Sequence, residues 1–339
     1  MTLPSRLAAD KTRVSIATRL LDRPVVEFGS VPGYGPIFNA GVIEIEGTFH
    51  LFARGVRDGY SRNRGPGARF LDYVSDVLVF TSTDGLDYRF QQMLADGASE
   101  GADSLEDPRV QWVRSRGHEQ VVMTYTHLPH LESGQPWRVG MHRLRYQGGR
   151  FALNPTSGRV VGPDGVPDKD AVLFNLRDGR IALIHRIHPD MQLAVFESLE
   201  HLADAGAEYW DDHLRNLDRH ILIRPARGAL GVGAGAPPVE TDLGLVLFYH
   251  ERDPELGYTT NVALLDDETG GVRAVLDEPI LRPELAWERT GDVDDVVFVQ
   301  GAVSRPDGTI YLTYGAADRC VGAAVVDTSR LLDALRAAS

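Results

Sequence analysis

Residues 42–54 read VIEIEGTFHLFAR, and this stretch decides the fold of the chain. Apolar and polar side chains alternate as far as Glu46-Gly47, and a second run of strand-forming residues follows at once. Alternation with a period of two predicts a β-strand, and glycine supplies the positive φ that a tight turn between antiparallel strands needs. The stretch therefore predicts a β-hairpin.

The same strand–turn–strand pattern occurs four more times, about every 60 to 70 residues. A further strand candidate follows each of the first four hairpins. Four strands in each of five equal units predict an all-β fold, a five-bladed β-propeller; two stacked β-sandwiches would not require even spacing. The predicted hairpins are residues 42–54, 110–127, 172–186, 238–250 and 302–315, and the further strands are 77–82, 137–144, 192–197 and 260–265.

Three stretches predict short helices added to the propeller. Residues 7–22 would form one at the N-terminus, and residues 198–217 would form an insertion before the fourth blade. Residues 329–337 would form a terminal helix after a cap at Asp327 or Thr328. We therefore expect a single domain over residues 1–339, with an extension over 1–35 and a C-terminal helix over 327–339.

Composition narrows the class of partner. The 339 residues include 48 acidic and 35 basic side chains, a net charge of −13, without the basic stripe that a nucleic-acid binder would show. No apolar run is long enough to cross a membrane, and none resembles a signal peptide, so we expect a cytoplasmic protein without membrane or nucleic-acid partners. Exposed blade edges would allow a homo-oligomer.

Cysteine and histidine usage predicts no metal. The single cysteine, Cys320, excludes an internal disulfide and a thiolate cluster. The pairs His127/His130 and His185/His188 have no cluster of Cys or carboxylate side chains beside them to complete a site.

Polar side chains recur at one phase of the repeat. The second strands of the hairpins end in residues such as Arg54, Arg186 and His250, and the last is followed by Asp318. The blades begin near Asn39, Glu106-Asp107, Lys169-Asp170 and Asp294-Asp295. Any one of these could cap a turn or pair with a neighbouring charge. Because equivalent positions of successive blades meet around one axis, their recurrence favours a catalytic pocket.

Five phrases, in this order, resemble glycoside hydrolase family 130 over residues 39–326. The resemblance implies a five-bladed propeller that acts on β-mannosides, most often as a phosphorylase and in some members as a β-mannosidase. For this chain it implies inverting phosphorolysis to α-mannose 1-phosphate, with inorganic phosphate as co-substrate and no cofactor. The phrases are EDPR at 106–109, KDAVLF at 169–174 with HR at 185–186, GAGAPP at 233–238, YH at 249–250 and GAAD at 315–318.

The resemblance also implies a role for each matching residue. Asp107 corresponds to the general acid. The mannoside would be bound by Asn39, Arg54, Glu106 and Asp318. Phosphate would be bound by Lys169, Arg186, His250 and Tyr258, with Lys169 at a position where the family often has arginine.

Two departures keep alternatives open. Gly231 stands where the family commonly has lysine, and Asp294-Asp295 adds negative charge. Both favour an inverting β-mannosidase, in which Glu240 or Asp295 would serve as the base that activates water. A second alternative is a non-catalytic sugar-binding propeller. The loops 57–69 and 127–136 are expected to border the acceptor sugar.

Overall fold

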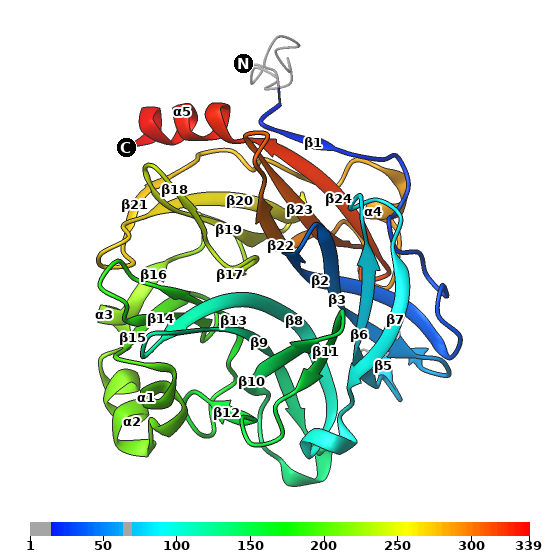
Figure 1. Ribbon diagram of the computed structural model, residues 1–339, viewed down its shortest axis with the longest axis horizontal. Coiled ribbons are helices and arrows are strands. Elements are labelled where there is room, and N and C mark those ends of the chain that lie inside the picture. The colour runs from blue at the N-terminus through cyan, green and yellow to red at the C-terminus, as the bar shows by residue number, and fades with distance from the viewer. Residues whose placement is uncertain (1–14, 64–69) are drawn as a thin grey trace, which may run out of the picture.

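The strands form five antiparallel sheets arranged in a ring around one axis (Figure 1). The computed structural model describes residues 15–63 and 70–339. Each sheet is one blade, whose first strand lies nearest the axis while later strands lie further out (Figure 1). The five-bladed β-propeller predicted from the sequence is confirmed.

The first three blades follow the chain in simple order. A two-stranded ribbon, β4 (Ser61–Arg62) with β5 (Phe70–Leu71), projects from blade one. Blade one is β2 (Tyr34–Ile45), β3 (Thr48–Arg57), β6 (Ser75–Ser82) and β7 (Arg89–Ala95). Blade two is β8 (Ala102–Ser115), β9 (His118–Pro129), β10 (Arg138–Gln147), β11 (Arg150–Leu153) and β12 (Arg159–Val161). Blade three is β13 (Lys169–Asn175), β14 (Ile181–Arg186), β15 (Met191–Phe196) and β16 (Ile221–Ile223).

The last two blades depart from that order. In blade four the innermost strand is split, because β17 and β18 both pair with β19. In blade five the outermost strand comes from the start of the chain. Blade four is β17 (Val232–Ala234), β18 (Val239–Thr241), β19 (Gly244–Asp253), β20 (Gly257–Leu265) and β21 (Val272–Val275). Blade five is β22 (Val297–Ser304), β23 (Thr309–Ala316), β24 (Cys320–Asp327) and β1 (Ala17–Arg19).

All five predicted hairpins are present, and the backbone conformation of their turns explains why glycine occurs there. Glu46 and Gly47 have φ values of 51° and 75°, and Arg116 and Gly117 have φ values of 50° and 78°. Two consecutive positive φ angles define the tight turn whose twist matches that of the flanking strands. The chemistry of these turns therefore fixes the register of the hairpins.

The N-terminal part of the chain closes the ring. β1 pairs antiparallel with β24, from Ala17 opposite Val326 to Arg19 opposite Ala324. The predicted helix over 7–22 is wrong where the structure describes it, since residues 17–19 are a strand; residues 7–14 lie outside the described residues. Pairing with a distant edge strand overrides local helix propensity here.

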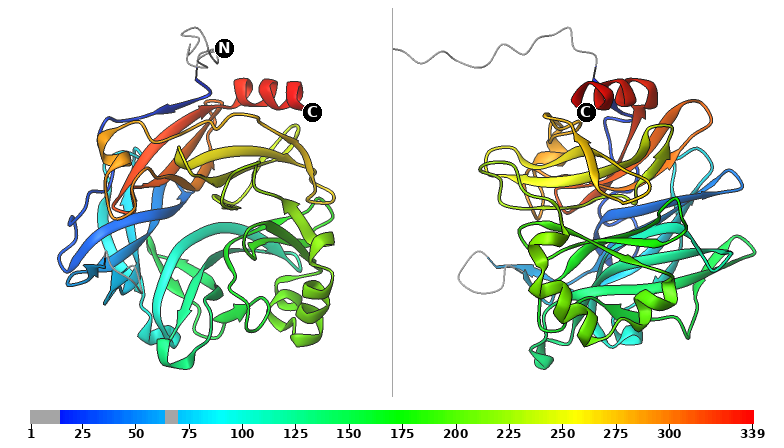
Figure 2. Two further views of the ribbon diagram at one scale, coloured as in Figure 1. Left: turned by 180° about the vertical axis from the view of Figure 1, so that it is seen from behind. Right: turned by 90° about the vertical axis from the view of Figure 1, so that its left-hand side faces the viewer.

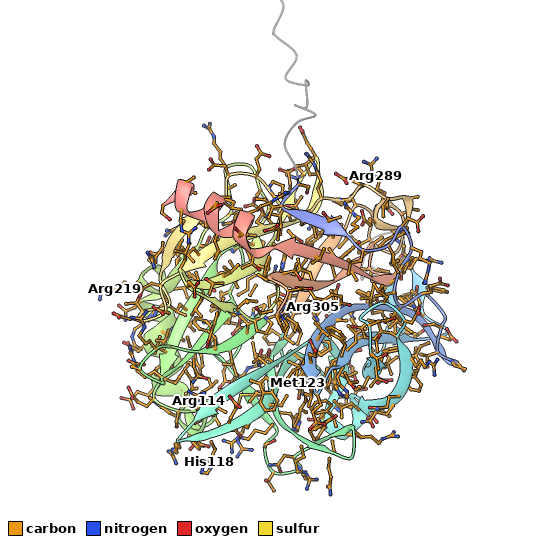
Figure 3. The ribbon with its side chains drawn as sticks, turned by 45° about the horizontal axis from the view of Figure 1, so that its top comes forward. Arg114, His118, Met123, Arg219, Arg289 and Arg305 are labelled. Atoms are coloured by element: carbon orange, nitrogen blue, oxygen red, sulfur yellow. The ribbon has the colours of Figure 1, made fainter. Side chains whose placement is uncertain are left out.

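Five apolar cores lie between successive blades. In one of them, Phe52 and Val79 of blade one pack with Leu105 and Met123 of blade two. Because a blade is covered on both faces, β3 is buried along almost its whole length. In Figure 3, Arg114, His118 and Arg219 lie at the rim of the molecule, whereas Met123 lies inside it.

The helices lie at the periphery (Figure 2). The predicted insertion forms α1 (Leu199–Asp204), α2 (Ala207–Arg215) and α3 (Leu217–His220). The insertion precedes β16, the last strand of blade three, so it lies within that blade and not between blades three and four. The capping carboxylate is Asp327, which accepts from the backbone N–H of Arg330 at the start of α5 (Thr328–Ala338). A short helix, α4 (Ala286–Arg289), precedes blade five.

Between residues 15–63 and 70–339, no helix is long and apolar enough to cross a membrane.

Candidate active site

A shared backbone distortion aims polar side chains at the axis. Asn39, Asp107 and Asp170 lie in the first strands of blades one, two and three, at breaks in the pairing register. All three have positive φ values, of 44°, 53° and 53°. A β-bulge inserts an extra residue and redirects its side chain, and a left-handed conformation of a non-glycine residue is strained. The repeat phase seen in the sequence is therefore a repeated bulge.

These bulges open into one pocket of about 240 Å³, lined by residues of all five blades. The nine site residues predicted from the sequence all line it. Four carboxyl groups and three basic side chains face this small volume, among the lining residues that the structure describes. The lining residues are Asn39, Arg54, Phe70, Tyr73, Glu106, Asp107, Lys169, Asp170, Arg186, His250, Tyr258, Val293, Val296, Phe298 and Asp318.

Asp107 lies on one side of the pocket and is almost fully buried. Its Oδ1 accepts a hydrogen bond from Nδ2 of Asn39 over 2.9 Å and lies 3.4 Å from Nη1 of Arg54. Nη2 of Arg54 donates to Oε1 of the neighbouring Glu106. Burial raises the pKa of Glu106 and Asp107 adds to that rise, while the positive charge of Arg54 opposes it. The guanidinium of Arg54 therefore contacts both adjacent carboxyl groups, those of Glu106 and Asp107.

The cationic part of the wall consists of Lys169 and Arg186, with Asp170 and His250 beside them. Oδ2 of Asp170 lies 3.2 Å from Nε of Arg186 and 3.5 Å from Nε2 of His250. Lys169 is the direct cross-strand partner of Arg186. Burial alone would raise the pKa of Asp170, but the charges of Arg186 and its other neighbours outweigh burial and hold that pKa well below the ordinary value. Asp170 is therefore an anion among these cations.

Burial lowers the pKa of His250 to about 4, although Asp170 opposes the shift. The imidazole ring is 4.1 Å from the ring of Phe298, centroid to centroid, and is neutral at pH 7. Tyr258 also lines the pocket, and burial raises the pKa of its phenol, so that it stays a hydrogen-bond donor. Both residues can donate to an anion without carrying a charge.

Aromatic residues add an apolar part to the wall. Tyr73 and Phe70 stack with ring centroids 4.6 Å apart, and Arg54 lies over the Tyr73 ring. Tyr60 packs against Tyr73 and donates to Asp292 over 2.5 Å. Tyr60 lies in the predicted acceptor loop 57–69, and Phe70 and Tyr73 follow it; residues 64–69 lie outside the described part of the chain.

Sequence reasoning missed several residues of the wall. The repeat phase of Asp107 does point to Asp170, but no role in the site was predicted for it. Phe70 and Tyr73 have no comparable signal, because they lie between β3 and β6, outside the repeated hairpins.

The two acids considered as a base for water lie elsewhere. Glu240 lines a different cavity, of about 260 Å³, together with Glu44 and Trp112. Asp295 does not line the pocket; its carbonyl oxygen accepts from the backbone N–H of Tyr258 over 2.8 Å. Glu240 is displaced because it lies on β18, which follows the interruption of the inner strand in blade four. No cluster of three or more His, Cys, Asp or Glu side chains within 15–63 and 70–339 could hold a metal ion.

Comparison with known proteins accords with this geometry. The model of the family described as β-1,4-mannooligosaccharide phosphorylase, glycoside hydrolase family 130, matches residues 13–337. The chain belongs to glycoside hydrolase family 130. The predicted enzyme class, a glycoside phosphorylase or hydrolase acting on β-mannosides, is thereby confirmed, and the non-catalytic alternative loses its support.

Two relatives from Thermoanaerobacter sp. (strain X514) match this family 130 chain over most of its length. A 1,2-β-oligomannan phosphorylase is 29% identical, over 91% of this chain and 96% of its own. A β-1,2-mannobiose phosphorylase is 30% identical, over 87% of this chain and 91% of its own.

Solved structures share the fold of this family 130 chain. The β-1,2-mannobiose phosphorylase of Listeria innocua, in complex with β-1,2-mannobiose, has a TM-score of 0.73 at 19% identity and covers 95% of this chain and 99% of its own. A mannose phosphorylase of Leishmania mexicana, in complex with a phosphate ion, has a TM-score of 0.63 at 18% identity and covers 91% and 88%.

Proposed function

We propose that this enzyme catalyses the inverting phosphorolysis of short β-1,2-linked mannosides, releasing α-mannose 1-phosphate and a chain shortened by one sugar. The observation that carries the proposal is the division of one small pocket. Asp107 with Asn39 and Arg54 forms one part, and Arg186 with Lys169 and His250 forms another. A sugar needs a proton donor for its leaving oxygen and a nucleophile at the anomeric carbon.

In this account Asp107 supplies the proton, directly or through a hydroxyl group of the substrate. Asn39 and Arg54 hold its carboxyl group in place, and Arg54, Glu106 and Asp318 bind hydroxyl groups of the mannose ring. Asp107 must act in its protonated form, because the leaving oxygen takes its proton. The bond from the anomeric carbon to the acceptor oxygen breaks as that oxygen takes the proton.

Phosphate attacks from the opposite face of the ring. Arg186 and Lys169 provide charge-assisted hydrogen bonds to its oxygens, and His250 and Tyr258 add neutral donors. A phosphate anion beside carboxylates would otherwise be repelled, and these cations offset the repulsion. The new bond joins the anomeric carbon to a phosphate oxygen, with inversion from β to α, so that no second catalytic carboxylate is required.

The β-1,2 linkage rests on the two relatives that span most of the chain, which are phosphorylases of β-1,2-oligomannan and β-1,2-mannobiose. The family description and a shorter match to a Ruminococcus albus enzyme instead name β-1,4-mannooligosaccharides. Both linkages therefore belong in the test.

One observation favours hydrolysis as the second candidate. Gly231 stands where the family commonly has lysine. A Cβ atom placed on Gly231 would lie 3.0 Å from Cε1 of His188, so a longer side chain there would displace His188. One structural relative belongs to the family 130 glycoside hydrolases that target β-1,2-mannosidic linkages, with a TM-score of 0.69 at 20% identity, covering 95% of this chain and 96% of its own. A base for water would then be sought among Glu106, Asp170 and Asp318.

The test is to incubate the protein with β-1,2- and β-1,4-mannobiose, each with and without phosphate. We expect consumption of the β-1,2 disaccharide only with phosphate, giving one mannose and one α-mannose 1-phosphate. Release of two mannose molecules at the same rate without phosphate would assign the protein to the hydrolases. The variant Arg186→Gln should raise the KM for phosphate and leave the KM for the disaccharide almost unchanged.

A further inference from the structure

Arg109 is a buried charge at the centre of the propeller. Its side chain is fully inaccessible to solvent, and it is the largest of the fully buried side chains. Burying a guanidinium is unfavourable unless all its donors are satisfied, and an apolar residue of similar size would often stabilise the fold as well. Packing alone therefore does not explain an arginine at this position.

The partners of Arg109 come from several blades. Nη1 donates to the carbonyl oxygen of Asp107 over 3.1 Å, and Nη2 donates to Oδ1 of Asp170 over 3.2 Å. Nη2 and Nε also donate to the carbonyl oxygens of Ala234 and Gly235, over 2.7 and 2.8 Å. Blades two, three and four thus meet at one guanidinium.

Two of these contacts lead directly to the pocket. The carbonyl oxygen of Asp107 belongs to a residue in the strained left-handed conformation that turns its carboxyl group towards Asn39. Asp170 has the same conformation, and its other carboxylate oxygen faces Arg186 and His250. Arg109 therefore fixes the position of Asp107, the proposed acid, and of Asp170, the carboxylate that contacts Arg186 and His250.

We propose that Arg109 and Asp170 are a pair of positioning residues that couples the general acid to the phosphate site. Arg109 holds the backbone of Asp107 and the carboxylate of Asp170 in one arrangement. Asp170 in turn directs Arg186 and His250 into the pocket before phosphate arrives. The inference rests on the proposed function, because it assigns those two side chains to phosphate.

The pair gives the cationic site its geometry before binding. Without a fixed carboxylate, Arg186 and the adjacent Lys169 would repel each other and move apart. When Asp170 is fixed, Arg186 is already ordered in the folded protein, so Arg186 loses less conformational freedom when phosphate binds. Replacement of Asp170 should therefore appear mainly in the KM for phosphate.

The experiment is a double-mutant cycle with Asp170→Asn, Arg109→Lys and the double variant. For Asp170→Asn we expect the KM for phosphate to rise about tenfold or more, as for the loss of one charge-assisted hydrogen bond, with the KM for disaccharide almost unchanged. Arg109→Lys keeps the charge but lacks the planar fork, so kcat should fall as well. The double variant should be no worse than the poorer single variant, because the two residues act as a unit.

Glu288→Gln is the matched control. Glu288 is a fully buried carboxylate that binds Arg19 over 2.6 Å, and it does not line the pocket. This variant should lower the melting temperature and leave both KM values unchanged. An equal rise in the KM for phosphate in Glu288→Gln would show a general effect of destabilisation and overturn the proposal.

The outcomes separate the two proposals. Cleavage by the wild type without phosphate would reject the proposed function, and the cycle would then be scored on the kcat of hydrolysis. Additive losses in folded Asp170→Asn and Arg109→Lys variants, or unchanged kinetics in both, would overturn the positioning pair in either case. If Arg109→Lys fails to fold, Asp170→Asn alone decides through the split between the two KM values.

Discussion

The side-chain amide of Asn39 donates a hydrogen bond to Oδ1 of Asp107 over 2.9 Å, although 68 residues separate the two in the chain. Both residues lie in bulges, and Gln300 of blade five donates to the carbonyl oxygens of Asn39 and Pro108 over 2.6 and 2.8 Å. Three blades therefore fix the place of one carboxyl group. An acid held in this way needs little reorganisation when the substrate binds.

Replacing that acid tests its role in proton transfer. Asp107→Asn keeps the shape of the side chain but removes the proton donor, so kcat for β-1,2-mannobiose should fall about a thousandfold. A 2,4-dinitrophenyl β-mannoside has a leaving group that needs no proton, so its cleavage should fall far less. Steady-state rates on both substrates check this, and equal losses would mean that Asp107 is not the acid.

Gly233 tests the cationic part of the wall without removing a charge. A Cβ atom there would lie 2.5 Å from Cε1 of His250 and would also meet Oδ2 of Asp170. Gly233→Ala should therefore push these side chains apart and raise the KM for phosphate about tenfold. A Cβ on Gly206 meets nothing within 4 Å, so Gly206→Ala is the control and should behave as wild type. A normal KM for phosphate in Gly233→Ala would contradict the assignment.

Acid should destabilise the protein through buried histidines. Burial, with smaller contributions from His185 and His220, lowers the pKa of His213 from 6.5 to about 3, and burial lowers that of His250 to about 4. Between about pH 6.5 and pH 4 the unfolded chain binds protons that the folded protein does not, so stability falls as the pH falls. For His250, the total loss in the free energy of unfolding across this pH range is about 3 kcal/mol.

His213 lies outside the pocket and allows a clean test. His213→Gln should reduce the loss of unfolding free energy between pH 7 and pH 4.5, measured by urea denaturation at several pH values. The matched control is His118→Gln, at the exposed start of β9 on the rim of the molecule (Figure 3). Identical pH dependence in wild type and His213→Gln would refute the prediction.

Closure of the ring depends on Arg19 as well as on the pairing of β1. Its Nε and Nη2 bind the buried carboxylate of Glu288 over 2.6 and 2.8 Å. Arg19→Ala leaves that charge unpaired and should lower the free energy of unfolding by about 3 kcal/mol without changing either KM. The exposed pair Arg23–Asp87, at 3.6 Å, provides the control: Arg23→Ala should change stability by less than about 0.5 kcal/mol. An unchanged denaturation midpoint for Arg19→Ala would contradict this view of closure.

The blades and most of the pocket could be predicted from the sequence for a physical reason. Turn glycines such as Gly47 and Gly117 mark hairpins through local backbone geometry, and five equal units imply a ring. Residues at one phase of that repeat then meet at the axis, as Asn39 and Asp107 do. Cytoplasmic location, freedom from cofactors and a homo-oligomer stay predictions.

The rest depends on contacts between distant segments. β1 has three residues, and its partner β24 lies at the other end of the chain, so local pattern favoured a helix there. The role of Arg109 depends on carbonyl groups of Ala234 and Gly235, which no sequence pattern joins to it. Glu240 was placed wrongly because the inner strand of blade four is interrupted between β17 and β18.

The most direct test of the account is a crystal structure of the enzyme soaked with mannose and phosphate. We predict a tetrahedral anion bound by Arg186, Lys169 and His250, and a mannose ring held by Asn39, Arg54 and Asp318 with its anomeric carbon facing the anion. A mannose ring occupying the cationic part of the pocket, or phosphate bound elsewhere while that part holds only water, would contradict phosphorolysis at this site.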